Sequence, residues 1–466
     1  MNVQKSSMGF TQALAQWAAT ATRSWSDPAK SAAERGIVDT VACMVAGAGD
    51  AAVESVSKGL QHWGGSGHAS AIGLDQGMDA PWAAMINGTA AHALDYDDVL
   101  DPAASHVSAV LVPALLALAE ETGASGSDVV DAYIVGVEVQ ECLAESVNMA
   151  YYTRGWHTTL TLGAPSAAAA CARLLGLDAQ QMLFAMSLAT SMSAGFKRQF
   201  GTQAKPFHAG LGAKNGILAA RMAAAGLTAD PSPFEGDRGF MDLMVGAQAQ
   251  GFGPEIARLQ GPTAVVSPGV WLKRYPCCAS THRAVDGLLQ LMGQHRLHSR
   301  DLVRVQTWVS EAAVRNLMYP QPANEMQARF SMEYCLAAAA LDGDLTLATF
   351  RAASLSRADL RSEMQKVSMW TDPEQPADMP STVKSWARVN IETTDGRLLQ
   401  TRVIDPKGYP AQPLSEIELA NKFKDCAAQQ STEIVDAFLS WRHIGDAPET
   451  RTLAAMLRQV QPRNSH

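Results

Sequence analysis

Twelve residues, "DYDDVLDPAASH" at positions 95–106, hold a dense group of side chains that could do chemistry. Asp95, Asp97, Asp98 and Asp101 fall within seven positions, and His106 follows a proline turn. No lysine or arginine lies among them, in a chain where charged residues make up only 18%. Three interpretations compete: a magnesium site, a solvated helix end, or one buried acid that takes part in proton transfer.

The metal interpretation rests on "DDVLD" (97–101), which matches the DDxxD pattern of helical terpene and prenyl synthases. Such a site needs a second set of acidic ligands and basic residues for the diphosphate. No second DDxxD pattern follows, so we predict no metal site. A solvated helix end is the plainer alternative, although acids there oppose the helix dipole. Asp95 lies three residues after His92 and four before Val99, which predicts an inward-facing side chain.

Two further segments bring imidazoles and an ammonium group. "GWHTTLTLGAPS" places His157 in a Gly/Thr-rich loop ahead of a helix, and helix N-termini favour anions. "GTQAKPFHAGLGAKNG" offers Lys205 and His208 beside glycines, which let a ligand approach the backbone. Each segment taken singly is equally compatible with a capped loop and a solvent-facing side chain.

The segment "WLKRYPCCASTHRAVD" (271–286) lies where the composition changes. It carries Lys273, Arg274 and His282. Cationic residues at a junction between domains commonly serve clefts, and they are also common on surfaces. The chain has no CxxC pair, so we interpret the neighbours Cys277 and Cys278 as small core residues rather than a redox pair.

Together these residues supply a carboxylate, imidazoles, ammonium groups and a guanidinium, without a nucleotide-binding loop. This inventory suits removal of a proton next to a carboxylate, because fixed positive charge stabilises the enediolate that forms. Lysine and histidine suit the roles of acid and base, because burial lowers their pKa values and so tunes them. A non-catalytic protein that binds polycarboxylates is the alternative, since it would need the basic residues without a proton-transfer pair.

The elements that must position these residues are mostly helical. From about residue 10 to 260, alanine-rich segments repeat apolar residues at spacings of three and four, which predicts closely packed helices. Ser127-Asp128 is expected to start one helix, and Gly176 to close another before Asp178 opens the next. The tail after "PLSEIELANKFKDCAA" is helical again and is expected to rejoin the first bundle.

The composition changes after Gly261. "LVRVQTWVS" (302–310) alternates like a strand, and "ARVNIETTDGRLLQTRVID" (387–405) predicts a hairpin around its Asp-Gly pair. "FSMEYCLAAAALDG" between them is helical. We therefore predict a mainly α fold. Residues 1–265 and 406–466 are expected to form a large all-helical domain, and residues 266–405 a smaller α+β domain.

The net charge and the hydropathy pattern of the chain limit the binding partners and the location that we expect. The net charge of −9 argues against nucleic acid and anionic membrane. The longest apolar stretch, around 107–119, is interrupted by Pro113 and is too short to span a bilayer. The first residues show no signal-peptide or transit-peptide pattern, and the seven scattered cysteines suggest no disulfide framework. We expect a cytoplasmic protein whose partner is a small polycarboxylate.

In order and spacing, "HALDYDD…SH", "GWHTTLTLGAPSAAAA", "GTQAKPFHAGLGA" and "LKRYPCCASTH" resemble the MmgE/PrpD family. "NIETTDGRLL" and "PLSEIELANKF" look like that family's closing segments, so the resemblance covers nearly the whole chain. The family includes 2-methylcitrate dehydratase, cis-aconitate decarboxylase and iminodisuccinate epimerase. The resemblance implies a helical domain with a smaller α+β lid domain, usually as a homodimer, and neither a metal nor an organic cofactor.

Carried over position by position, the family's site falls on Asp95, His106, His157, Lys205, Lys273 and, through a looser match, Tyr319. This assignment leaves Asp97, Asp98 and Asp101 structural or solvated. We expect Lys205 and His157 to form the proton-transfer pair and Asp95 to orient or tune an imidazole. Lys273, Arg274 and His106 are expected to hold carboxylates and stabilise the enediolate, with His208 and His282 as further substrate-binding residues.

Two departures from the family pattern guide the choice of reaction. Val99-Leu100 follow the acidic motif where the dehydratases and decarboxylases carry Thr-Trp or similar, and "SHVSAV" replaces "GHPSDN". A hydroxyl-bearing, citrate-like substrate would lose polar contacts there. We therefore predict a cofactor-independent epimerase of an amino-dicarboxylate such as iminodisuccinate, acting at Cα. The alternatives are a lyase like 2-methylcitrate dehydratase and, after it, a lyase like cis-aconitate decarboxylase.

Overall fold

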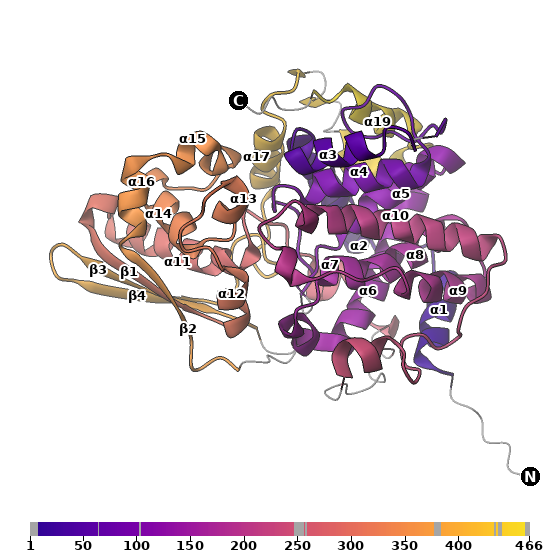
Figure 1. Cartoon of the computed structure of the whole chain (residues 1–466), viewed down its shortest axis with the longest axis horizontal. Helices are drawn as coiled ribbons and strands as arrows, with labels where there is room; N and C mark the ends of the chain where they lie inside the picture. Colours follow the sequence, from indigo (N-terminus) through magenta and orange to yellow (C-terminus); the bar gives the residue numbers. More distant parts are fainter. Residues whose placement is uncertain are drawn as a thin grey trace, which may run out of the picture.

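The computed structural model describes residues 8–63, 65–101, 104–246, 256, 259–376, 384–432, 435–436 and 440–461, with side chains except at 148–150. Figure 1 shows a larger helical part beside a smaller part that contains the sheet. Helices dominate and the strands form one four-stranded sheet, so the predicted mainly α fold is confirmed for this part of the chain. The division into domains at residues 265 and 405 stays a prediction.

Ten helices from the N-terminal half build the larger part. They are α1 (Phe10–Thr20), α2 (Asp27–Gly47), α3 (Ala51–Gly59), α4 (Ala80–His92), α5 (Ser108–Thr122), α6 (Gly126–Arg154), α7 (Thr158–Thr161), α8 (Gly163–Leu174), α9 (Ala179–Thr190) and α10 (Ala204–Ala224). Caps set several of their ends. Asp178 caps α9 as expected, whereas α6 begins earlier than predicted because Ser125, not Ser127, forms the capping box with Asp128.

The close approach of α4 and α10 depends on glycine. A Cβ at Gly210 would lie 2.2 Å from the Met85 carbonyl oxygen, and one at Gly88 would lie 2.9 Å from the Gly210 Cα. Only residues without a side chain let the two backbones pack at this distance. This contact matters for the site, because α4 ends at His92 and α10 carries Lys205.

The smaller part is built on a mixed sheet with the strand order β2-β1-β3-β4. Its strands are β1 (Leu302–Val309), β2 (Val367–Thr371), β3 (Ala387–Thr393) and β4 (Leu398–Val403). Strands β1 and β2 are parallel, and the other two pairs are antiparallel. The predicted hairpin is confirmed, with Gly396 at a φ of 83° in its turn, whereas β2 was not predicted.

Helices cover this sheet and fill the second hydrophobic cluster (Figure 1). They are α11 (Ala279–His295), α12 (Glu311–Asn316), α13 (Glu325–Ala328), α14 (Met332–Asp342), α15 (Ala352–Leu355) and α16 (Ala358–Met364). Along β3 the residues Ala387, Val389 and Ile391 alternate inward and pack against them. Near the C-terminus, α17 (Glu416–Cys426) and α19 (Arg451–Ala455) join the core of the larger part, as expected for the tail.

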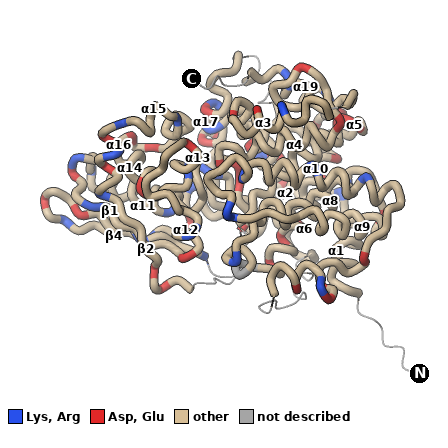
Figure 2. The backbone as a smooth tube through the Cα atoms, viewed as in Figure 1, with Lys and Arg blue, Asp and Glu red and all other residues tan. Residues whose placement is uncertain are grey.

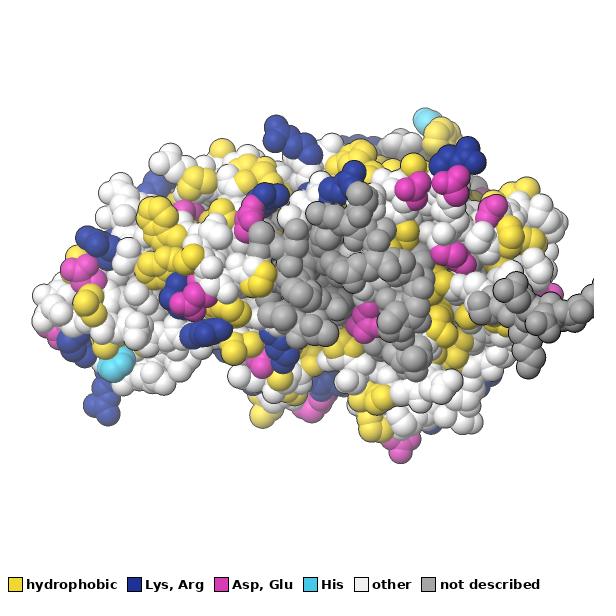
Figure 3. All heavy atoms as spheres, turned by 90° about the horizontal axis from the view of Figure 1, so that it is seen from below, with side chains coloured by type: hydrophobic (Ala, Val, Ile, Leu, Met, Phe, Trp, Pro, Cys, Tyr) yellow, Lys and Arg dark blue, Asp and Glu magenta, His cyan; other side chains and the backbone are white. Residues whose placement is uncertain are grey.

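Charge is distributed unevenly along the chain. Figure 2 shows long uncharged stretches in the central helices of the larger part and more frequent charges in the sheet part. On the face in Figure 3, basic and acidic side chains are intermixed outside the grey residues. No single described helix is long and apolar enough to cross a membrane; α2 and α3 pass that test only as a pair, bent by 85°.

Candidate active site

Three segments of the larger part and one segment that leads into α11 meet in a buried polar cluster. The α4 helix ends at His92, and the following loop carries Asp95, Asp97 and His106. His157 caps α7, and Lys205 and His208 lie one turn apart on α10. Lys273 lies just before α11 and is 0% exposed. We call these eight residues the polar cluster; all are buried.

Asp95 lies between two ammonium groups. Its Oδ1 is 2.5 Å from Lys205 Nζ, and its Oδ2 is 3.1 Å from Lys273 Nζ. Lys273 also donates to the Asp95 carbonyl oxygen at 2.7 Å. The φ of Asp95 is 54°, a left-handed conformation that costs a side-chain-bearing residue energy and is typical of functional sites. Asp95 therefore contacts lysines rather than orienting an imidazole, which corrects its expected role.

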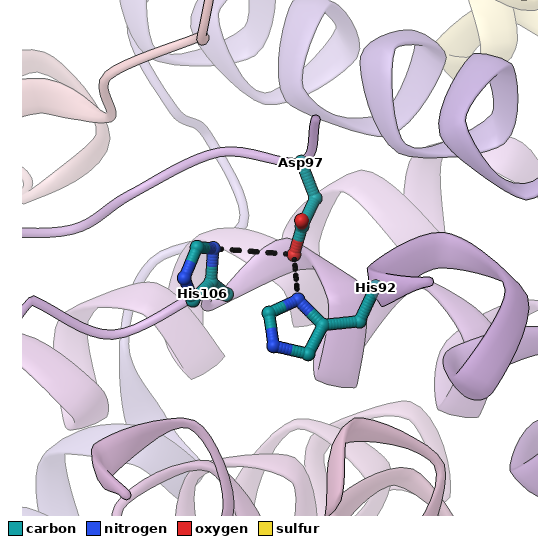
Figure 4. Close-up of side chains that lie close together, drawn as sticks. All are labelled: His92, Asp97 and His106. Atoms are coloured by element: carbon teal, nitrogen blue, oxygen red, sulfur yellow. Dashed lines mark hydrogen bonds and ion pairs between the residues drawn. The ribbon is translucent and has the colours of Figure 1, made fainter. Parts of the chain in front are cut away.

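Asp97 holds the imidazoles instead. Figure 4 shows its carboxylate between two rings, with Oδ2 at 2.7 Å from His92 Nδ1 and 3.3 Å from His106 Nδ1. The other nitrogen of His92, Nε2, lies 2.8 Å from Lys205 Nζ. Of the two roles expected for Asp97, the solvated one is excluded, because Asp97 is fully buried within the cluster, where it bonds His92 and lies beside His106.

The neighbouring acids have different roles. Asp98 accepts hydrogen bonds from the backbone and hydroxyl groups of Ser108, so it pins the start of α5 and is structural as expected. Burial raises the pKa of Asp98 to about 7, against the lowering effect of Ser108. Asp101 is half-buried at the edge of the loop. A solvated helix end is therefore excluded for Asp95, Asp97 and Asp98, all of which are buried.

His157 and His208 form a second imidazole pair. Their Nδ1 atoms are 2.9 Å apart, and the His157 ring packs against Phe200 and stacks with His92. His157 Nε2 is buried and has no hydrogen-bond partner among the described residues. A buried ring nitrogen without a partner is costly unless a ligand or water pairs with it. This atom is therefore the cluster's most direct candidate for exchanging a proton with a substrate.

The electrostatics keep the imidazoles neutral and the carboxylates charged. Burial lowers the pKa of His92 to about 3 and that of His208 to about 4, and it also lowers the pKa values of His106 and His157. Burial alone would raise the pKa of Asp95, but the Lys205 and Lys273 ammonium groups hold it well below its usual range. Burial would lower the pKa of Lys273, but Asp95 and Asp97 raise it.

The structure does not bring every predicted residue to the cluster. Arg274 follows Lys273 at a bend, and its guanidinium group lies 3.6 Å from Asp344, outside the cluster. His282 is buried between the Trp271 and Tyr275 rings and donates to the Cys277 carbonyl oxygen. Neither forms a described hydrogen bond with the cluster, so their expected contact with the substrate is not supported.

Tyr319 reaches the cluster indirectly. Its hydroxyl group donates to the Phe200 carbonyl oxygen at 2.8 Å, and the Phe200 ring contacts His157. The Phe200 ring also lies 5.4 Å from Lys205 Nζ. Tyr319 thus supports the wall beside the imidazole and the ammonium group.

Sequence reasoning missed His92 and Asp97 as site residues. The five-residue separation in "HALDYD" was visible, but it gains meaning only from the turn after α4. The left-handed Asp95 reverses the chain, so that Asp97 returns to the ring of His92. Aspartate is among the non-glycine residues enriched in this conformation, but the residue type alone does not show which of the four aspartates adopts it.

His92, Asp97 and His106 also form a group whose ligand atoms lie within 4.8 Å of one another, close enough to hold a metal ion. The donor set does not favour one. Asp97 Oδ2 already accepts from His92 and lies beside His106, and two ammonium groups lie next to the same loop. A divalent cation would be repelled by those ammonium groups. Our expectation of no metal stays a prediction, now on chemical grounds.

Comparisons with known proteins identify relatives and a family. The chain is 28% identical to a cis-aconitate decarboxylase of Homo sapiens over 395 residues, which cover 82% of this chain and 80% of that protein. It is 26% identical to a cis-aconitate decarboxylase of Aspergillus terreus over 450 residues, which cover 91% and 90%. The MmgE/PrpD N-terminal domain model matches residues 12–252 and the C-terminal domain model residues 275–438. The resemblance seen in the sequence is confirmed: the chain belongs to the MmgE/PrpD family.

Proposed function

We propose that this protein is a cofactor-independent lyase that decarboxylates a small unsaturated polycarboxylate of the cis-aconitate type. The relatives favour this reaction, which was an alternative in the sequence analysis, over the epimerase that we placed first. The observation that carries the proposal is the polar cluster itself. Two buried ammonium groups, both in contact with Asp95, and a buried imidazole nitrogen with no hydrogen-bond partner among the described residues belong to this one cluster, and they support the proposal.

Decarboxylation needs both the ammonium groups and the imidazole nitrogen. When the bond between a carbon and its carboxylate breaks, CO2 leaves and the electron pair passes into the rest of the conjugated acid. Lys205 and Lys273 stabilise the resulting enediolate, because fixed positive charge is most effective where water is excluded. A proton must then be added to carbon. We assign this step to the pair of His157 Nε2 and the Lys205 ammonium group.

The His157–His208 pair suits proton movement in either direction. If His157 donates from Nδ1 to His208, its Nε2 carries a lone pair and accepts a proton. If His208 is the donor, His157 Nε2 carries the hydrogen and delivers it. The 2.9 Å separation of the Nδ1 atoms permits both tautomers. Lys205 Nζ donates to Asp95 at 2.5 Å, and we assign its ammonium group the role of an acid rather than that of a base.

Epimerisation of an amino-dicarboxylate is the second candidate, because it uses the same enediolate and the same proton-transfer pair. One observation favours it over dehydration. Val99 and Leu100, which stand where polar residues were expected, are buried and pair with the backbones of Trp271 and Ser105. They offer no hydroxyl group to a hydroxy-acid substrate or to its leaving water.

Proton NMR of the purified, metal-stripped protein with three substrates distinguishes these reactions. We expect loss of CO2 from cis-aconitate at a rate proportional to enzyme concentration, with iminodisuccinate and 2-methylcitrate unchanged. Interconversion of iminodisuccinate stereoisomers without action on cis-aconitate would establish the epimerase instead. A requirement for added divalent metal would overturn the cofactor-independent mechanism.

A further inference from the structure

Lys197 is a buried lysine that the polar cluster does not include. It begins the 3₁₀ helix η1 (Lys197–Gln199) and is 8% exposed. Its Nζ lies 3.6 Å from the centre of the Tyr152 ring and 3.4 Å from the Tyr152 carbonyl oxygen. Among the described residues no carboxylate lies within ion-pair distance of it. By contrast, the other fully buried lysines, Lys205, Lys273 and Lys422, each contact an aspartate.

A buried ammonium group without a counter-ion is costly. Burial lowers the pKa of Lys197 to about 7, and the nearby Arg315 lowers it further, while the Cys278 thiol acts in the opposite direction. The Tyr152 ring offsets part of this cost through a cation–π contact. An anionic ligand would supply the missing counter-charge.

A second unused polar group lies beside Lys197. Asn316, at the end of α12, donates from Nδ2 to the Tyr152 hydroxyl group at 3.0 Å and to Ser280 Oγ at 3.2 Å. Its Oδ1 is buried and has no partner among the described residues. If the Asn316 amide is turned so that Oδ1 and NH2 change places, Oδ1 accepts hydrogen bonds from both hydroxyl groups. The NH2 group is then the one left free. In either orientation Asn316 has one polar group left for a ligand.

Lys197, Tyr152 and Asn316 lie next to the polar cluster. Cys278, the residue before α11, is close enough for its thiol to interact electrostatically with Asp95 and Lys273 and also with Lys197. Phe200, three residues after Lys197, packs against the ring of His157. The Tyr152 hydroxyl group accepts from Asn316, and its own proton remains to donate because burial raises the pKa of Tyr152.

We propose that Lys197, Tyr152 and Asn316 form a second carboxylate-binding subsite, which receives the substrate carboxylate farthest from the reacting carbon. The inference rests on the proposed function and adds a substrate class to it. Lys273 and Lys205 hold the reacting end, and the Lys197 ammonium group with two neutral donors holds the distal end. The enzyme therefore prefers three carboxylates to two.

Calorimetric titration at pH 6.5 tests this preference with two unreactive ligands, tricarballylate with three carboxylates and glutarate with two. Lys197→Met should weaken tricarballylate binding about 10- to 100-fold, the typical effect of losing one hydrogen bond to a charged group, and change glutarate binding little. Asn316→Asp should also weaken tricarballylate, because it places a negative charge in the subsite. Lys214→Met is the matched control, since Lys214 is a half-buried lysine near the Trp82 ring, outside both sites.

The dependence on pH gives an independent readout. Tricarballylate binding should weaken as the pH rises above 7, because Lys197 loses its proton, and Lys197→Arg should abolish this change. The groups that face Lys197 do not titrate there. Burial raises the pKa of Cys278 to about 11 and also raises that of Tyr152.

Equal weakening of both ligands by Lys197→Met, or no weakening of either, would overturn the subsite. In that case a wild-type protein that still binds tricarballylate and turns over cis-aconitate would leave the proposed function intact. A wild-type protein that binds neither ligand and acts on no polycarboxylate would overturn both.

Discussion

At the scale of single residues, the proposed reaction depends on His157 Nε2, which has no hydrogen-bond partner among the described residues, and on the charges around it. His157 Nε2 is buried, and its ring is fixed by His208, Phe200 and His92. A group held in this way loses little orientational freedom when a substrate arrives. The ammonium groups of Lys205 and Lys273 are held by Asp95, through contacts other than those that fix the His157 ring.

His157→Asn should lower kcat about 10²- to 10⁴-fold, the usual contribution of a positioned acid or base, while substrate binding persists. Steady-state kinetics and titration with tricarballylate measure the two effects separately. His295→Asn, at the exposed C-terminal end of α11, is the control and should change neither. An unchanged kcat in His157→Asn would remove this residue from the proton-transfer step.

Asp97→Asn should reduce kcat at least about 10²-fold, because the amide no longer fixes the tautomers of His92 and His106. The adjacent Asp98→Asn provides a matched control, since Asp98 bonds Ser108 and contacts no imidazole. We expect Asp98→Asn to keep most of the activity at neutral pH. Equal losses in both variants would mean that the loop, rather than the imidazole contact, matters.

At the scale of elements, the cluster is held together by the contact between α4 and α10. Those helices place His92 and Lys205 within 2.8 Å of each other across 113 residues of sequence. The contact depends on Gly210, where a side chain would meet the backbone of α4. The catalytic geometry is therefore sensitive to a residue that touches no substrate.

Gly210→Ala should force the two helices apart, lower the free energy of unfolding by about 1–3 kcal/mol as overpacking does, and reduce activity. Gly293→Ala in α11 is the control, because nothing lies within 4 Å of its added methyl group. That variant should be neutral or slightly stabilising. Urea unfolding and kcat together test this prediction; an active, fully stable Gly210→Ala protein would contradict it.

The sequence was informative wherever a local rule decides the structure. The repeat of apolar residues predicted the long helices, and the Asp395-Gly396 pair predicted the β3–β4 hairpin. It failed where distant contacts decide. The parallel strand β2 pairs with β1, which lies more than fifty residues earlier in the chain. Arg274 likewise contacts Asp344, seventy residues later in the chain, rather than the cluster.

The candidate site shows the same difference between what local sequence predicts and what distant contacts decide. Asp95, His106, His157, Lys205, His208 and Lys273 lie in one cluster, as motifs from separate segments indicated. The different contacts of Asp95 and Asp97 could not be predicted. The order of residues in the segment does not show that Asp95 adopts a left-handed conformation. That turn sends Asp95 to the lysines and Asp97 to the imidazoles.

At the scale of the whole molecule, burying several neutral histidines makes stability depend on pH. Burial lowers the folded-state pKa of His92 to about 3 and that of His208 to about 4, from the ordinary value of 6.5. The unfolded chain therefore binds more protons than the folded protein as the pH falls below 6.5. Stability from these groups is fully present above 6.5 and is lost as the pH falls toward 3.

Asp98 changes the dependence of stability on pH in the opposite direction. Its folded-state pKa is raised to about 7 from 3.8, so the stability that it contributes is fully present below 3.8 and is lost as the pH rises through 7. Between pH 3.8 and 6.5 the loss from Asp98 opposes the gain from His92 and His208, and the two histidines outweigh the single aspartate. We therefore expect the midpoint of urea unfolding to fall as the pH drops below 6.5, and Asp98→Asn to make this fall steeper, because it removes the opposing contribution. A midpoint that is constant from pH 4 to 6.5 would contradict the buried neutral imidazoles.

The central claim is that the polar cluster adds a proton to a carbon next to a carboxylate. Incubation with cis-aconitate in D2O, followed by proton and carbon NMR, tests it most directly. We predict a decarboxylated product that carries solvent deuterium at one carbon, formed by the wild-type protein and by His295→Asn but not by His157→Asn. Product without deuterium at carbon, or equal formation by His157→Asn, would contradict the account.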